Sequence, residues 1–255
     1  MGLMQGSHLA RELPEPGKLY ALLVDLAGED EAMRAGTAGG LDQAEELANP
    51  GRDATAITVV EVDLHLQADE LVGKPIYKVV QRYLWTGEKH STQYARLLAL
   101  VERWQPQRIV VDASGVGAGV ASFLADRFGE RVVQLRFTQQ VKSRLGWGFL
   151  AVIDTGRFQD HLANGNSNEA ERLQALFQRQ LAAVNYRVSS GPEHFIAWGV
   201  LETARDPESG GLLHDDLVLS AAMVAVLDEQ PWSVSSSAPL VIAAADPIKE
   251  MDGGF

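Results

Sequence analysis

The 255-residue sequence contains no cysteine, which excludes disulfides, thiolate catalysis and cysteine-ligated zinc sites together. Basic residues are also scarce, since 22 Lys and Arg stand against 34 Asp and Glu and the formal net charge is -12. Affinity for phosphate backbones comes mainly from Lys and Arg, so this balance argues against a protein that coats nucleic acid. A nuclease is not excluded, because carboxylates that hold divalent cations contribute to such an acidic balance.

Long apolar runs are missing too. No stretch approaches the roughly 20 residues that span a bilayer, and the N-terminus lacks the basic-then-apolar order of a signal peptide. We therefore expect a cytoplasmic protein with no membrane partner. Residues 1–16 combine Gly, Ser, His and Pro without periodicity and predict a loose leader, while Pro, Ser, Ala and Asp dominate a predicted tail over residues 231–255.

The strongest single pattern is residues 18–26, KLYALLVDL, which is typical of a strand buried on both faces. The apolar run leads without a charge to Asp25. A buried charge is costly unless it is paired, hydrogen-bonded or bound to a metal, so this carboxylate needs an explanation. The plainer interpretation is that Asp25 starts a turn at an exposed strand end.

The remaining patterns predict an α/β fold. Further strands are expected at 54–62, 76–85, 108–112 and 132–137, and helices at 91–104, after Gly117, at 142–158, at 173–184 and at 217–227. The first three strands follow one another directly and favour an antiparallel meander, whereas the later alternation of strand and helix favours parallel pairing. The result is a mixed central sheet. Residues 28–52, rich in Gly and Ala, predict a surface excursion, and a weak hairpin is expected over 186–198.

Four carboxylates share one feature, because each lies at the boundary of a strongly apolar element. Asp25 and Asp112 end predicted strands, while Asp215 and Asp216 begin the apolar last helix. In an open sheet, active sites lie beyond the strand ends, and carboxylate oxygens suit Mg²⁺ and Mn²⁺. Clustered acids repel one another. Two metal ions about 3.5–4 Å apart would relieve the repulsion, activate water and stabilise the leaving oxygen in phosphodiester cleavage.

Each of these positions has an alternative explanation. Asp215 is a good N-cap for the last helix, and Asp112 could cap the helix that follows its strand. Gly115 and Gly117 could form a phosphate loop, although no GK[ST] follows them. His214 is either an ordinary loop histidine or a residue that orients an acid or contacts phosphate.

Basic residues fit a DNA path only locally. Four basic residues cluster around the strand after Asp112, where a substrate backbone could pass: Arg131, Arg136, Lys142 and Arg144. The alternative is a solvated basic patch of the kind found on many proteins.

Four segments together resemble a known family. They are VDLA at Asp25, RDATAITVVEV over 52–62, IVVDASGVGAGV at Asp112 and LLHDDLVLSAAMVA at Asp216. In this order they look like the C-terminal nuclease domain of tailed-bacteriophage terminase large subunits. These domains belong to the RNase H-like superfamily, as do Holliday-junction resolvases and transposase or integrase cores. The resemblance implies an RNase H-like domain over 17–230, with helices on both faces of the mixed sheet.

By the same resemblance, the protein would be a Mg²⁺- or Mn²⁺-dependent endonuclease that cuts double-stranded DNA during phage genome packaging. Asp25, Asp112 and Asp216 would hold two ions, with Asp215 as a fourth acidic group. The implied partners are double-stranded DNA, a terminase ATPase domain, the small terminase subunit and the portal. The 28–52 excursion is longer than such domains usually have, and no Walker A motif marks an ATPase half.

Two other functions remain open from the sequence. One is a different RNase H-like nuclease, such as a resolvase or an RNA:DNA hybrid nuclease. The other is a binding or assembly module that keeps the fold without useful activity, which the acidic charge of -12 would favour.

Overall fold

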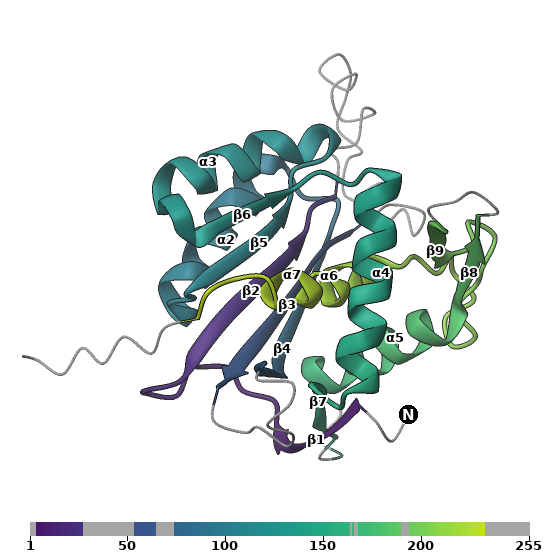
Figure 1. Ribbon diagram of the computed structural model, residues 1–255, viewed down its shortest axis with the longest axis horizontal. Coiled ribbons are helices and arrows are strands. Elements are labelled where there is room, and N and C mark those ends of the chain that lie inside the picture. The colour runs from purple at the N-terminus through teal and green to yellow at the C-terminus, as the bar shows by residue number, and fades with distance from the viewer. Residues whose placement is uncertain are drawn as a thin grey trace, which may run out of the picture.

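The computed structural model describes residues 4–27, 54–64, 74–163, 165, 168–189 and 194–232. Its centre is a seven-stranded mixed sheet with strand order β1-β7-β4-β3-β2-β5-β6 (Figure 1). These strands are β1 (Gln5–Leu9), β2 (Leu19–Asp25), β3 (Ala54–Asp63), β4 (Ile76–Thr86), β5 (Arg108–Asp112), β6 (Val132–Leu135) and β7 (Phe158–Leu162). A separate hairpin pairs β8 (Val184–Val188) with β9 (Ile196–Val200). The predicted 28–52 excursion lies outside the described residues.

Helices cover both faces of the sheet, as predicted (Figure 1). One face carries α2 (His90–Trp104) and α3 (Ala118–Phe128), while the other carries α4 (Gln139–Asp154), α5 (Glu169–Ala183), α6 (Asp216–Ala222) and α7 (Val224–Leu227). Short 3₁₀ turns span Gly115–Gly117 and Gly129–Arg131. Strand β2 serves both layers, because Leu22 packs with α2 and α3 while Leu23 packs with the other helices. This explains its uninterrupted apolar sequence.

Strand β2 lies where the two halves of the sheet meet. It pairs antiparallel with β3, and β3 pairs antiparallel with β4, so the predicted meander is confirmed. On its other side, β2 pairs parallel with β5, which in turn pairs parallel with β6. The carboxyl ends of β2, β5 and β6 therefore lie next to one another, along the edge of the sheet where these strands end.

The expectation of a loose leader over residues 1–16 is wrong for its middle part. Gln5–Leu9 forms strand β1, which pairs parallel with β7 at the sheet edge. His8 Nε2 lies 2.7 Å from the carbonyl oxygen of Val79, and Arg11 donates its backbone N–H to Val80. These backbone contacts hold a polar segment that has no apolar periodicity of its own.

The helix predicted to reach residue 158 ends at Asp154, and Phe158 begins a strand instead. Gly156 adopts a φ of +68°, a left-handed conformation that ends the helix. The Thr155 hydroxyl donates to the Ala151 carbonyl oxygen at 2.7 Å, and the same oxygen accepts the Thr155 backbone N–H at 3.2 Å.

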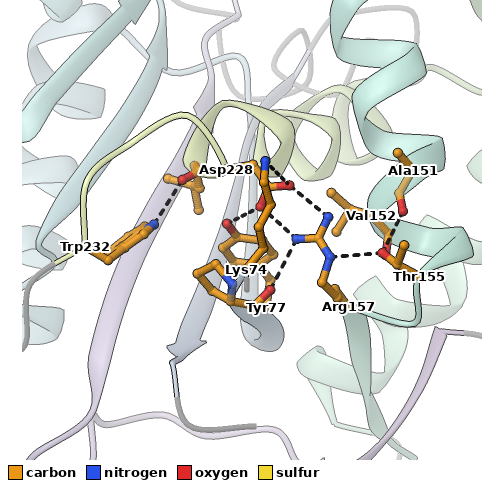
Figure 2. Close-up of polar contacts among 10 residues, drawn as sticks. Lys74, Tyr77, Ala151, Val152, Thr155, Arg157, Asp228 and Trp232 are labelled. Carbon is orange, nitrogen blue, oxygen red and sulfur yellow. Dashed lines mark hydrogen bonds and ion pairs between the residues drawn. The ribbon is translucent and has the colours of Figure 1, made fainter. Parts of the chain in front are cut away.

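The end of α7 is fastened to the opposite edge of the sheet (Figure 2). Asp228 accepts a 2.6 Å hydrogen bond from the Tyr77 hydroxyl and two 2.8 Å hydrogen bonds from the Arg157 guanidinium. Tyr77 and Arg157 lie at the starts of β4 and β7. Burial would raise the pKa of Asp228, but these donors hold that pKa below its ordinary value. The predicted tail is ordered at its start, because Trp232 Nε1 donates to the Leu227 carbonyl oxygen at 3.0 Å. Residues 233–255 lie outside the described part.

Candidate active site

Asp25 and Asp112 are the last residues of two neighbouring parallel strands. Val24 of β2 is paired with Val111 of β5, so the residue that follows each of them lies at the same edge of the sheet. The two aspartates are buried, with 8% and 6% of their surfaces exposed. The alternative that Asp25 is an exposed turn residue is therefore wrong.

Asp216 comes from the other end of the chain and reaches the same edge. It is the first residue of α6, which packs against β2 and β3. Its Oδ2 atom lies 3.4 Å from the backbone nitrogen of Ala54, at the start of β3. The Ser220 hydroxyl, one turn further along, donates to the Leu23 carbonyl oxygen at 2.9 Å. These contacts place the start of α6 over the end of β2.

The electrostatics show that the carboxylates act on one another. Burial raises the pKa of Asp25 well above its ordinary value, and the negative charges of Asp216, Asp112 and Asp215 raise it further. The ammonium group of Lys142 opposes this rise. Asp25 is thus the centre of a group of acids that is unfavourable without a compensating cation.

Asp112 is held in place by a turn. Burial raises its pKa, while hydrogen bonds from Ser114 and the charge of Lys142 act in the opposite direction. The Ser114 backbone N–H donates to Asp112 Oδ1 at 2.8 Å, and the Ser114 hydroxyl accepts a 2.7 Å hydrogen bond from the Phe137 backbone. The Asp-Ala-Ser spacing is typical of such a turn, so sequence reasoning could have found this residue.

Asp215 and Asp216 point to different partners. Asp215 occupies the N-cap position of α6 but makes no side-chain capping bond, so the capping explanation is wrong. Its Oδ2 atom instead lies 3.4 Å from the backbone nitrogen of Val200 in β9. A Cβ on the neighbouring Gly199 would lie 2.6 Å from the same oxygen. Asp215 therefore faces the hairpin, whereas Asp216 faces the sheet. His214 is partly buried just before this pair.

The basic residues suggested by the sequence separate in the structure. Lys142, near the start of α4, is close enough to lower the pKa of both Asp25 and Asp112. Arg136 is exposed directly after β6, at the edge that holds the carboxylates. Arg144 is 61% exposed and lies 3.6 Å from Glu229, beyond the end of α7. This ion pair joins two exposed side chains, and the role of Arg144 as a DNA contact stays a prediction.

The sequence did not predict one residue that supports the start of α6. Gln180, in the last turn of α5, is buried and accepts a 3.0 Å hydrogen bond from the Leu217 backbone N–H. This bond satisfies one of the free donors at the start of α6 and fixes the helix next to Asp216. A glutamine inside an amphipathic helix has no local signal for that role.

The donor chemistry of this edge fits a divalent cation of the Mg²⁺ or Mn²⁺ type, because the buried groups are carboxylates whose charges raise the pKa of Asp25. Among the residues that the structure describes, however, no three His, Cys, Asp or Glu side chains are arranged to hold one ion. The acids share an edge and an electrostatic field without converging on a single point.

An antiparallel meander continued by parallel strands, with carboxylates at two adjacent strand ends and a third from a late helix, defines an RNase H-like α/β domain. The model of the family described as "Terminase RNaseH-like domain" matches residues 39–187, more than half of the chain. The chain belongs to this terminase family. The matched segment contains Asp112, while Asp25 and Asp216 lie outside it.

Solved structures show the same fold. The large terminase nuclease from thermophilic phage G20c with bound magnesium has a TM-score of 0.57 at 17% identity, over 88% of this chain and 93% of that one. The same nuclease with bound cobalt has a TM-score of 0.55 at 17% identity, over 89% and 94% of the two chains. The large terminase nuclease domain of Thermus phage P74-26 has a TM-score of 0.51 at 16% identity, over 91% and 95%.

No curated protein sequence matches this chain. Within the described ranges, no helix has both the length and the apolar character needed to cross a bilayer.

Proposed function

We propose that this chain is a divalent-metal-dependent endonuclease that cuts double-stranded DNA during phage genome packaging. The observation that carries the proposal is the buried Asp25 carboxylate, surrounded by the charges of Asp112, Asp215 and Asp216 at one edge of the sheet. Membership of the terminase RNaseH-like family supports it, and so do the similar phage nuclease structures with bound magnesium and with bound cobalt.

Asp25, Asp112 and Asp216 are the residues that would hold two Mg²⁺ or Mn²⁺ ions, with Asp215 close by as a further acidic group. When bound, such ions would supply an activated water and stabilisation of the departing oxygen. The chain itself contributes orientation. Ser114 restrains the Asp112 carboxylate, and the contacts of Ser220 with β2 hold Asp216 in place.

The substrate backbone would pass along the edge that carries Lys142 and Arg136. This path is local, because the whole chain has a net charge of -12 and repels DNA elsewhere. Most of the affinity for DNA would therefore come from partner proteins. We propose that these are a terminase ATPase domain, the small terminase subunit and the portal, and that they act together in the host cytoplasm.

The test is cleavage of a linear duplex by the purified chain with Mn²⁺, with Mg²⁺ and with EDTA. Asp25→Asn should abolish cutting, because it removes the central carboxylate while keeping its shape. The matched control is Asp126→Asn, an exposed aspartate on α3, which should cut like the wild type. Equal Mn²⁺-dependent cutting by Asp25→Asn and wild type would refute the proposed site.

The substrate class is decided in the same assay. Preferred cutting of a linear duplex over a four-way junction and an RNA:DNA hybrid supports the packaging nuclease. A preference for the junction or for the hybrid would instead identify a resolvase or a hybrid nuclease. No cutting of any substrate, together with no effect of Mn²⁺ on the melting temperature, would identify a binding module.

A further inference from the structure

The β8–β9 hairpin is fastened to the first turns of α4. The Ile196 backbone N–H donates to the buried Ser143 hydroxyl at 3.0 Å, and Trp198 Nε1 donates to the Lys142 carbonyl oxygen at 2.7 Å. A Cβ on Gly146, one turn further along the helix, would overlap the indole of Trp198. A glycine at this position is what lets the tryptophan ring lie against the helix.

Trp198 restrains Lys142 twice. Besides the bond to the main chain, its ring lies 5.8 Å from the Lys142 ammonium nitrogen, within the range of a cation–π contact. A lysine side chain has many rotamers in solution, and a restrained one loses less entropy when it meets a ligand. One indole therefore limits where both the backbone and the charge of this residue can lie.

The start of α4 lies near the acids, because the helix begins four residues after β6, whose Leu135 is paired with Asp112. The hairpin lies there too, since Asp215 Oδ2 is 3.4 Å from the backbone nitrogen of Val200. Arg144, two residues further along α4, points to Glu229 instead. A phosphate group that approaches the carboxylate edge thus meets the charge of Lys142.

We propose that Trp198 is a positioning residue for the nucleic-acid substrate, which holds the Lys142 ammonium where it contacts a backbone phosphate beside the acidic edge. The inference rests on the proposed function for the identity of the substrate. Trp198 acts through Lys142 and does not touch the reacting atoms. A contact with a backbone phosphate carries no sequence information, so this contact is independent of the DNA sequence.

The experiment compares wild type, Lys142→Ala, Trp198→Ala and their double variant in the cleavage of one linear duplex with Mn²⁺ at several KCl concentrations. Lys142→Ala should raise KM about tenfold, the effect of losing one charge-assisted contact, with a smaller change in kcat. It should also reduce the slope of log KM against log[KCl] by about 0.9, the value for one phosphate contact.

Trp198→Ala should reproduce both changes, and the double variant should be no worse than the more affected single variant. Trp198→Phe, which keeps a ring but loses the Nε1 donor, should fall between wild type and Trp198→Ala. The matched control is Trp147→Ala, because Trp147 lies on the same helix and is 51% exposed. It should keep the wild-type KM and salt slope.

A wild-type salt slope in Trp198→Ala would overturn the inference. So would a KM of the double variant raised by the product of the two single-variant factors, because the two residues would then act independently. Should Trp198→Ala fail to fold, a Trp198→Phe variant identical to wild type would overturn it as well. If the wild type cuts nothing, the proposed function fails, and the same variants are compared by fluorescence anisotropy with the duplex. Equal slopes for all variants would then refute the role of Trp198 separately.

Discussion

Asp25 and Asp112 end neighbouring strands in a register that pairs Val24 with Val111. This register, together with the start of α6 above it, concentrates buried negative charge at one edge of the sheet. A protein keeps such an arrangement at a cost in stability, because like charges in a buried site repel one another.

Asp25→Asn should stabilise the metal-free protein, because it removes the central charge of the group. We expect a higher melting temperature in EDTA at neutral pH, with about 2–4 °C for each kcal/mol of relief in a chain of this size. Mn²⁺ should raise the melting temperature of the wild type but hardly that of the variant. Differential scanning calorimetry measures both, with Asp126→Asn as the control. Equal gains from Mn²⁺ in wild type and Asp25→Asn would contradict the assignment.

Asp216→Asn and Asp215→Asn should differ sharply in activity. The Asp216 carboxylate lies at the start of β3, and its removal should lower cleavage more than about 100-fold, since even outer-shell partners of a metal cost 10–100-fold. Asn at 215 can still accept the bond from Val200, so Asp215→Asn should lose less than about tenfold. Cleavage rates at saturating Mn²⁺ measure the difference. A larger loss in Asp215→Asn would reverse the two roles.

The protein should lose stability below pH 6.5 because of His8 and His161. Burial lowers the pKa of both histidines below the ordinary value of 6.5. The unfolded chain then takes up protons that the folded protein does not, so the stability present above pH 6.5 is lost as the pH falls toward the folded pKa values. His161→Gln should reduce the loss of unfolding free energy between pH 7 and pH 5 by about 1 kcal/mol.

Urea denaturation at the two pH values measures this difference. The control is His194→Asn, because His194 is exposed and has a φ of 46°, which asparagine tolerates. An unchanged pH dependence in His161→Gln would show that this residue does not cause the acid sensitivity.

Asp228→Ala should destabilise the fold by about 3–5 kcal/mol, because it leaves the Arg157 guanidinium, only 9% exposed, without its partner. Tyr77→Phe removes one hydrogen bond to the same carboxylate and should cost about 1.5 kcal/mol. Chemical denaturation gives both values. Asp154→Ala, at the exposed end of α4, serves as the control and should be nearly neutral. A cost for Asp228→Ala no larger than that for Tyr77→Phe would contradict the buried ion pair.

Much of the fold could be predicted from local patterns. The strand expected at 108–112 has those bounds in the structure, and the one expected at 18–26 spans Leu19–Asp25. Both are continuous apolar runs with polar ends, and burial on two faces leaves that signature in any sequence. Strands β1 and β7 were missed because QGSHL and FQDHL are short and largely polar. They pair with each other across more than 140 residues of chain, which no local pattern records.

The candidate site divides in the same way. The amino-acid sequence by itself determined which carboxylates stand at the ends of apolar elements, because a buried strand or helix has a characteristic spacing of apolar residues. Only the tertiary structure decided that Asp216 faces the sheet and Asp215 the hairpin, and that Lys142 lies against Trp198 while Arg144 lies against Glu229. The direction of a side chain depends on contacts with segments far away in the chain, and adjacent residues of like charge are equivalent until those contacts form.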